Sequence, residues 1–180
     1  LDHYVDTQER ENRFVGYYSP KFSGLQFQIA TMPGKGDEAE LGDAVSTALV
    51  YGDPKMKKSN YYLGIAYDDE VDGAETQAFR LAGSVKLGDL GLGAIVENAD
   101  DGSDDHMRYI ASGFYKIGDG KLELQYANAD ELGEHGESDQ ATIGWEHKLG
   151  GGASAYIAYS KRELEDVASD HASVGFIYKF

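Results

Sequence analysis

The sequence predicts an all-β fold, a transmembrane antiparallel β-barrel of which about 11 strands are present. Apolar and polar residues alternate with a period of two in many segments, short turns alternate with longer acidic connections, and aromatic residues recur near the segment ends. The 180-residue chain has no Cys and no apolar run near the roughly 18 residues of a membrane-spanning helix. If this chain crosses a membrane, it does so with strands.

Six segments show the alternation most clearly. In the first, Leu25, Phe27 and Ile29 alternate with two glutamines, so one face of the predicted strand is apolar and the other polar. These segments are residues 25–30, 60–67, 79–86, 121–126, 140–146 and 172–180. Weaker alternation marks residues 13–18, 44–51, 90–98, 107–116 and 153–162, which brings the predicted strands to eleven.

The connections between these strands alternate in kind. Short turns rich in Gly, Pro, Ser and Asp are predicted at residues 19–24, 52–59, 87–89, 117–120 and 149–152. The other connections are longer and hold 22 of the 32 carboxylates but one of the 16 Lys and Arg residues; they are residues 33–43, 68–75, 99–106, 130–139 and 163–170. This asymmetry is typical of bacterial transmembrane barrels, with short periplasmic turns and longer extracellular loops. The net charge of −16 argues against a nucleic-acid partner.

A soluble sandwich or a lipocalin-like barrel also has alternating strands, with the apolar face turned inward. Aromatic placement argues against this alternative, because tyrosines such as Tyr61, Tyr67 and Tyr126 recur near strand ends on the apolar parity, as in interfacial girdles. The opposite parity carries charges that a dry core would not tolerate and a water-filled lumen would. These predicted pore-lining residues are Arg80, Lys86, Arg108, Lys116, Glu123, Glu146 and Arg162.

Two stretches resemble the general diffusion porins of Gram-negative bacteria. Residues 12–27, NRFVGYYSPKFSGLQF, are similar to the strand, periplasmic turn and strand that follow the pore-constricting third loop of that family. The last residues, VGFIYKF, resemble its final strand, and the resemblance implies that Phe176, Tyr178 and Phe180 form the signal read by the barrel-assembly machinery. It also implies that residues 1–12 are the tail of the constriction loop and residues 13–180 the C-terminal strands of one barrel domain. Family barrels have about 16 strands and close with an even number, so we expect five further strands upstream of residue 1.

The resemblance implies a function as well as a fold. We expect an outer-membrane channel for passive diffusion of small hydrophilic solutes and ions, without enzymatic activity or a cofactor. The acidic loops predict a mild cation preference. Expected partners are a homotrimer, outer-membrane lipid with lipopolysaccharide, and the assembly machinery. Arg80, Lys86, Arg108 and Lys116 would oppose acids of the constriction loop, or would merely keep the lumen wet. The alternative function is a pore-less barrel that acts as an anchor or adhesin.

Other candidate sites are weak. Residues 100–105, DDGSDD, superficially resemble a calcium loop but lack the spaced ligands and the terminal Glu of an EF-hand. His106, His135, His147 and His171 lack the spacing of a zinc site, and no metal site is predicted.

Overall fold

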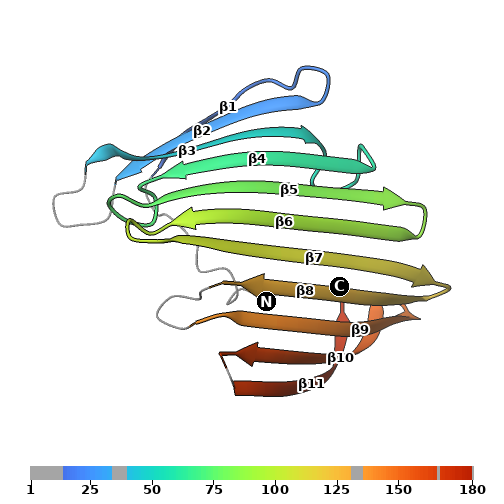
Figure 1. The fold of residues 1–180 in the computed structure, drawn as a ribbon. Helices are drawn as coiled ribbons and strands as arrows, with labels where there is room; N and C mark the ends of the chain where they lie inside the picture. The colour runs from blue at the N-terminus through green and yellow to red at the C-terminus, as the bar shows by residue number, and fades with distance from the viewer. Residues whose placement is uncertain (1–13, 34–39, 131–135, 166, 180) are drawn as a thin grey trace. The chain divides into compact units, whose positions relative to one another are not determined.

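A computed structural model describes residues 14–33, 40–130, 136–165 and 167–179. Within these residues the chain forms eleven β-strands in one sheet, in sequence order (Figure 1). The strands are β1 (Val15–Tyr18), β2 (Leu25–Pro33), β3 (Leu41–Gly52), β4 (Tyr61–Asp69), β5 (Gln77–Leu87), β6 (Leu90–Asp100), β7 (Asp105–Ile117), β8 (Gly120–Ala129), β9 (Ser138–Gly150), β10 (Ala153–Leu164) and β11 (Val167–Tyr178). The all-β prediction and the predicted strands are confirmed. The described residues contain no helix able to cross a membrane.

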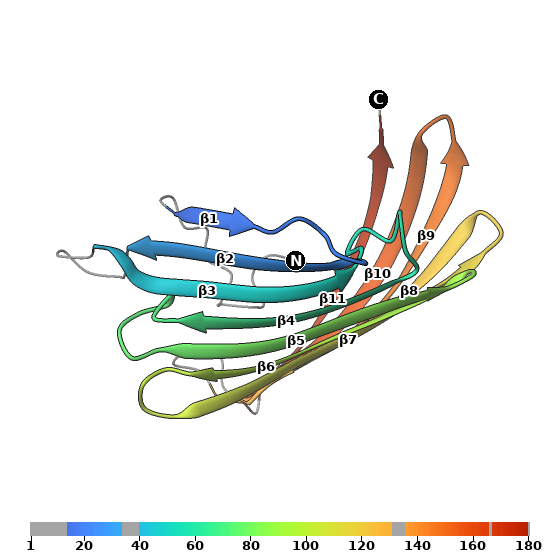
Figure 2. The same cartoon turned by 90° about the horizontal axis from the view of Figure 1, so that it is seen from above.

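The chain divides into two compact units. The first comprises Leu1–Gly83 and Ile95–Arg108, and the second comprises Ser84–Ala94 and Tyr109–Phe180. In the first unit β1 to β4 pair antiparallel with their neighbours in sequence, and in the second β8 to β11 do the same (Figure 2). The expected tail of the constriction loop, residues 1–12, and the terminal Phe180 lie outside the described residues.

Register places apolar side chains of neighbouring strands opposite one another. In the first unit Leu49 of β3 lies opposite Phe27 of β2 and Ile65 of β4. In the second unit Ile157 of β10 lies opposite Trp145 of β9 and Val174 of β11. Because side chains alternate between the two sides of a strand, this register gathers the apolar parity of each unit on one face.

That apolar face is exposed rather than packed into a core. Ile65 is 41% exposed in the first unit, and Ile157 is 60% exposed in the second. Among the described residues the only buried apolar residues are one methionine and four alanines, Met32, Ala44, Ala78, Ala99 and Ala129. A soluble sandwich or lipocalin-like barrel would bury its large aliphatic and aromatic side chains. The apolar parity therefore faces away from any dry interior, as it does in a strand that meets lipid.

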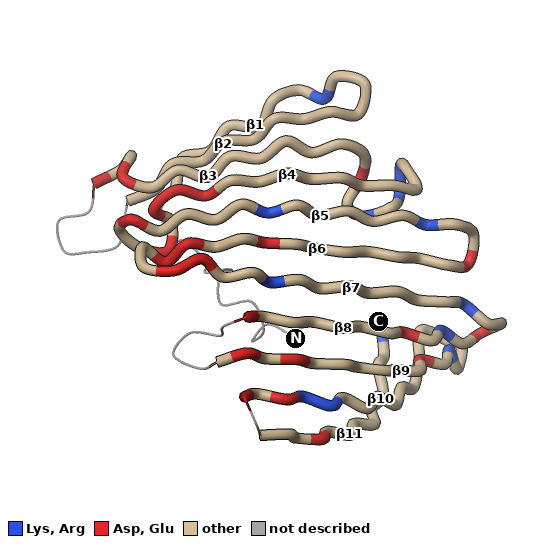
Figure 3. The backbone as a smooth tube through the Cα atoms, viewed as in Figure 1, with Lys and Arg blue, Asp and Glu red and all other residues tan. Residues whose placement is uncertain are grey.

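Connections alternate in charge as the sequence predicts, and Figure 3 shows acidic residues gathered at one set of strand ends in each unit. At the opposite ends three hairpins have two-residue turns, whereas the longer residues 19–24 join β1 to β2 and residues 53–60 join β3 to β4. Two residues, Gly88 and Asp89, join β5 to β6, and Gly88 has φ 63°, which a two-residue hairpin turn of this kind requires.

Two of the acidic connections are shorter than the sequence indicates. Residues 163–170 were expected to form a loop, but two residues separate β10 from β11, and Glu163 pairs with Ala168 inside the ladder. Likewise four residues, 101–104, separate β6 from β7. Acidic residues have a low propensity for strands, but backbone hydrogen bonds to the neighbouring strand keep them in the ladder here. Part of the acidic charge thus lies on strand ends rather than in free loops.

Candidate functional site

Three charged side chains meet on the polar side of the strands in the first unit. Two of them were predicted from the sequence, and the third was not. Arg80 lies on β5, Glu97 on β6 and Arg108 on β7, and each is the fourth residue of its strand counted from the end next to an acidic connection. Their sequence neighbours Leu81, Val96 and Met107 are exposed on the apolar parity. We call Arg80, Glu97 and Arg108 the Arg80 triad.

One carboxylate bridges the two arginines of this triad. Nε of Arg80 donates a 2.6 Å hydrogen bond to Oε2 of Glu97, and a second guanidinium nitrogen of Arg80 contacts the same oxygen. Nη1 of Arg108 lies 3.5 Å from the other carboxylate oxygen, Oε1. The side chain of Glu97 is 3% exposed, against 21% for Arg80 and 15% for Arg108. A buried carboxylate held by two charge-assisted contacts is the form in which buried charges persist in proteins.

Glu97 was not among the residues predicted from the sequence. The weak alternation of residues 90–98, rich in Gly and Ala, gave its parity little support. A usable signal was present in the turn, because residues that flank a two-residue hairpin turn pair with each other. Counting outward from Gly88 and Asp89 places position 80 opposite position 97. Arg80 and Glu97 could therefore have been paired from turn length alone.

A second charged cluster lies in the second unit. Lys121 Nζ is 2.8 Å from Oε1 of Glu123 on the same strand and 3.2 Å from Oε2 of Glu146, its register partner on β9. These side chains are more exposed, at 32% for Lys121, 49% for Glu123 and 27% for Glu146. Lys121 is the second residue of β8, next to the tight turn at Gly118 and Asp119. We call Lys121, Glu123 and Glu146 the Lys121 triad.

The remaining predicted pore-lining residues lie apart from these triads. Lys86 is six positions beyond Arg80 on β5, and Lys116 is eight positions beyond Arg108 on β7. Both therefore lie near the tight turns rather than beside Glu97. Arg162 of β10 is opposite Gln140 of β9 and Ser169 of β11. Near it on the same parity, the hydroxyls of Thr142 and Ser160 are hydrogen bonded at 2.9 Å.

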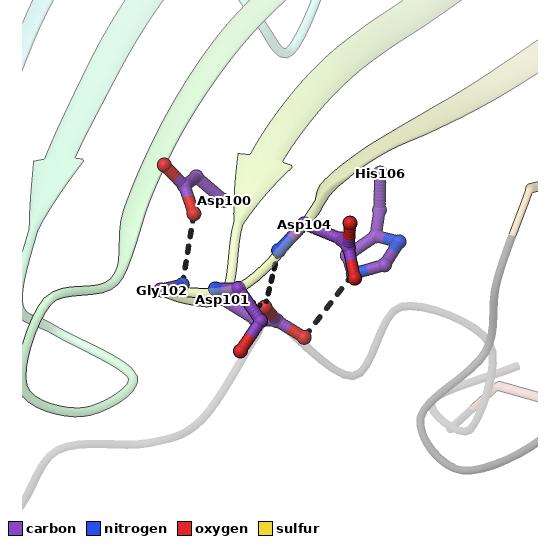
Figure 4. Close-up of polar contacts among 6 residues, drawn as sticks. Asp100, Asp101, Gly102, Asp104 and His106 are labelled. Atoms are coloured by element: carbon purple, nitrogen blue, oxygen red, sulfur yellow. Dashed lines mark hydrogen bonds and ion pairs between the residues drawn. The ribbon is translucent and has the colours of Figure 1, made fainter.

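The acidic connection between β6 and β7 is organised by its own backbone (Figure 4). Asp101 Oδ1 accepts hydrogen bonds from the backbone N–H groups of Ser103 and Asp104, at 2.9 and 3.0 Å, and Oδ2 lies 3.2 Å from Nε2 of His106. Hydrogen bonds from Asp104 and Ser103, with a smaller contribution from His106, lower the pKa of Asp101 to about 2. In the described part of the chain no group of three potential ligands is positioned to hold a metal ion.

The last strand presents its aromatic residues on the exposed face. Phe176 is 63% exposed and Tyr178 is 58% exposed, and Tyr178 pairs with Ala153 at the start of β10. The backbone N–H of Lys179 then donates to the carbonyl of Gly152 at 3.0 Å. The assembly-signal role expected for Phe176 and Tyr178 stays a prediction.

Comparison with known proteins places these features in context. A family model described as Gram-negative porin matches residues 1–166. A porin structure refined at 1.8 Å resolution superposes with a TM-score of 0.67 at 20% identity, covering 93% of this chain and 60% of its own. A loop L8 deletion mutant of OmpT, an outer-membrane protein of Vibrio cholerae, gives 0.58 at 16% identity, covering 91% and 61%. This chain thus spans about three fifths of either structure. A search of curated proteins gave no match.

Proposed function

Because the chain belongs to the Gram-negative porin family, we propose that it forms part of the wall of a water-filled channel through which small hydrophilic solutes and ions diffuse passively. The family places the chain in the bacterial outer membrane, and it supports a channel rather than an enzyme. The observation that carries the proposal is the division of each unit into two faces. One face exposes large apolar side chains, and the other carries ion-paired charges.

The polar parity supports a wet lumen rather than a plugged one. Arg80, Arg108, Glu123 and Glu146 all lie on it, and a dry interior would make such charges costly. We assign the predicted residues Lys86, Lys116 and Arg162 to the same lining on parity alone. Charged rings of this kind set the selectivity of wide pores through local potential rather than through stereospecific binding.

A mild cation preference follows from where the acids lie. The acidic connections hold 22 of the 32 carboxylates, and the longer loops of a bacterial transmembrane barrel lie at one mouth of the channel. The negative potential of these connections raises the local cation concentration over about a Debye length, roughly 10 Å at 0.1 M salt. The preference should therefore weaken as the salt concentration rises.

The partners proposed for this protein follow from the same features. The exposed apolar face supports contact with outer-membrane lipid, and the acidic connections support contact with lipopolysaccharide through divalent cations. The exposed aromatic residues of β11 support recognition of Phe176, Tyr178 and Phe180 by the assembly machinery during insertion. A homotrimer is proposed on the family resemblance.

Single-channel recording in a planar bilayer tests this function. The full-length protein is extracted from the native outer membrane and measured under a potassium chloride gradient. We expect stepwise openings in multiples of three and a reversal potential on the cation side. In concentrated salt the reversal potential should move toward the value of a non-selective channel. Silence from a folded, heat-modifiable barrel would refute the channel and favour an anchor or adhesin.

A further inference from the structure

Glu97 stands apart from the other carboxylates of the described chain. It is the one Asp or Glu there whose residue is buried, at 2% exposure, although 32 of the 180 residues are acidic. It lies on β6, between the two strands that carry Arg80 and Arg108. A buried carboxylate on the polar parity of a strand is costly unless cations hold it, so its position ties it to these two arginines.

The contacts give each carboxylate oxygen of Glu97 its own arginine. Oε2 accepts the 2.6 Å hydrogen bond from Arg80, and Oε1 faces Arg108 at 3.5 Å. Two guanidinium groups from flanking strands repel each other, and a carboxylate between them offsets that repulsion and holds both against the sheet. Glu97 therefore controls where the two arginine charges lie as well as how much charge the wall presents.

We propose that Glu97 is a selectivity-determining and positioning residue of the channel, which bridges Arg80 and Arg108 and reduces the attraction of this part of the wall for anions. The inference rests on the proposed channel function and deepens it. The three side chains together carry two positive charges and one negative charge. Without Glu97 this part of the wall would carry one negative charge fewer beside its two arginines, and the cation preference of the channel would fall.

Burial distinguishes this carboxylate from other acids of the same parity. The Glu97 side chain is 3% exposed, whereas Glu123, in contact with Lys121, is 49% exposed. Ions screen an exposed charge efficiently and a buried one much less. The contribution of Glu97 to selectivity should therefore persist in salt concentrations that abolish the contribution of Glu123.

The experiment compares Glu97→Gln with Glu123→Gln in the full-length channel, because both variants remove one negative charge with little change in shape. Reversal potentials are measured at 0.1 M and 1 M potassium chloride, where the Debye length is about 10 Å and about 3 Å. We expect Glu97→Gln to lower the potassium-to-chloride permeability ratio by about twofold or more at both concentrations, since a wall potential shifts the two ions in opposite directions. Glu123→Gln should have an effect only at 0.1 M.

Three further variants separate charge from position and cover a failure of Glu97→Gln to fold. Arg108→Gln should shift selectivity toward cations, and the double variant Glu97→Gln with Arg108→Gln should return near the wild-type ratio. Glu97→Asp keeps the negative charge on a shorter side chain. It should therefore keep the wild-type permeability ratio but change the single-channel conductance. Folded Glu97→Gln channels with wild-type selectivity at both salt concentrations, or a double variant without compensation, would overturn the inference. Either result leaves the channel function intact, whereas a silent wild-type protein removes the function itself.

Discussion

The Arg80 triad and the Lys121 triad use the same residue types in opposite proportions. The first joins two cations to one carboxylate, and the second joins one cation to two carboxylates. They also differ in place, because Arg80 lies near the strand end that follows an acidic connection and Lys121 beside a tight turn. The cation-rich triad thus accompanies the acidic connections, and the acid-rich triad accompanies the turns.

Burial adds a second difference between the triads. Glu97 is 3% exposed, whereas the least exposed side chain of the Lys121 triad, Glu146, is 27% exposed. An exposed ion pair contributes little to stability, while a buried charge depends on its partners. The comparison teaches that similar charged clusters on the polar parity of two units can have different environments, one around a buried carboxylate and the other exposed to water.

Removing the cations of each triad should give the largest difference in stability between the two triads. The double variant Arg80→Met with Arg108→Met takes both arginine partners from Glu97, and we expect it to lower the free energy of unfolding by about 3 kcal/mol. Lys121→Met leaves two exposed carboxylates and should cost less than about 1 kcal/mol. The apparent melting temperature of the full-length protein in detergent, followed by circular dichroism, compares the two.

A triple variant serves as the control for this prediction. Adding Glu97→Met to the double variant removes the buried charge itself, so much of the lost stability should return, as it does when a buried ionic group is replaced by apolar side chains. Equal destabilisation by the double variant and by Lys121→Met would show that the difference in burial has no energetic consequence.

The turns of the two units offer a second comparison, with a smaller expected effect. Gly52 of the first unit has φ 91°, and a Cβ there would lie 2.3 Å from the carbonyl oxygen of Tyr61. Gly88 of the second unit has φ 63°, with no atom within 4 Å of such a Cβ. Gly88→Ala carries only the left-handed backbone penalty, about 1 kcal/mol. Gly52→Ala adds a backbone clash, so we expect about 2 kcal/mol or more.

The same melting measurement decides this prediction. Gly52→Ala should melt at a clearly lower temperature than Gly88→Ala, because the β3–β4 hairpin must shift to admit the methyl group. Similar melting temperatures for both variants would mean that this hairpin adjusts freely, and that the register which aligns Leu49 with Ile65 tolerates local movement.

Much of this fold was predictable because a strand that meets lipid on one side and water on the other has a sequence in which apolar and polar residues alternate. Segments such as residues 25–30 and 172–180 alternate clearly, and they lie within or overlap β2 and β11. Strand ends were less predictable, since Glu163 and Asp170 read as loop residues but lie in the ladder of β10 and β11. Strand propensity is a property of single residues, whereas pairing with the neighbouring strand decides where a strand ends.

The triads were only partly predictable for a related reason. Arg80, Arg108, Glu123 and Glu146 follow from parity, but which of them meet depends on register and on the reach of long side chains. Glu97 was missed because the residues before it on β6, residues 93–96, do not alternate between apolar and polar. Turn length, which fixes hairpin register, was the missing step.

The pH dependence of the acidic connection beside the Arg80 triad gives the last and smallest effect. The folded-state pKa of Asp101 is about 2, lowered by backbone hydrogen bonds from Asp104 and Ser103. A carboxyl group with a lowered folded-state pKa contributes stability above its unfolded pKa of about 3.9, and that contribution is lost as the pH falls through the folded value. The difference in melting temperature between the wild type and Asp101→Asn should therefore be largest above about pH 4 and should vanish toward pH 2.

Asp104→Asn is the matched control, because it removes the same formal charge from the same connection while leaving the two hydrogen bonds from the backbone of Ser103 and Asp104 to Asp101 in place. The loss of stability specific to Asp101→Asn should consequently not appear in Asp104→Asn between pH 4 and pH 2. If both variants followed the wild type in parallel over this range, the carboxylate of Asp101 would not be organising the connection. The acidic connection would then differ from the Arg80 triad as the Lys121 triad does, with its charges solvated and without structural consequence.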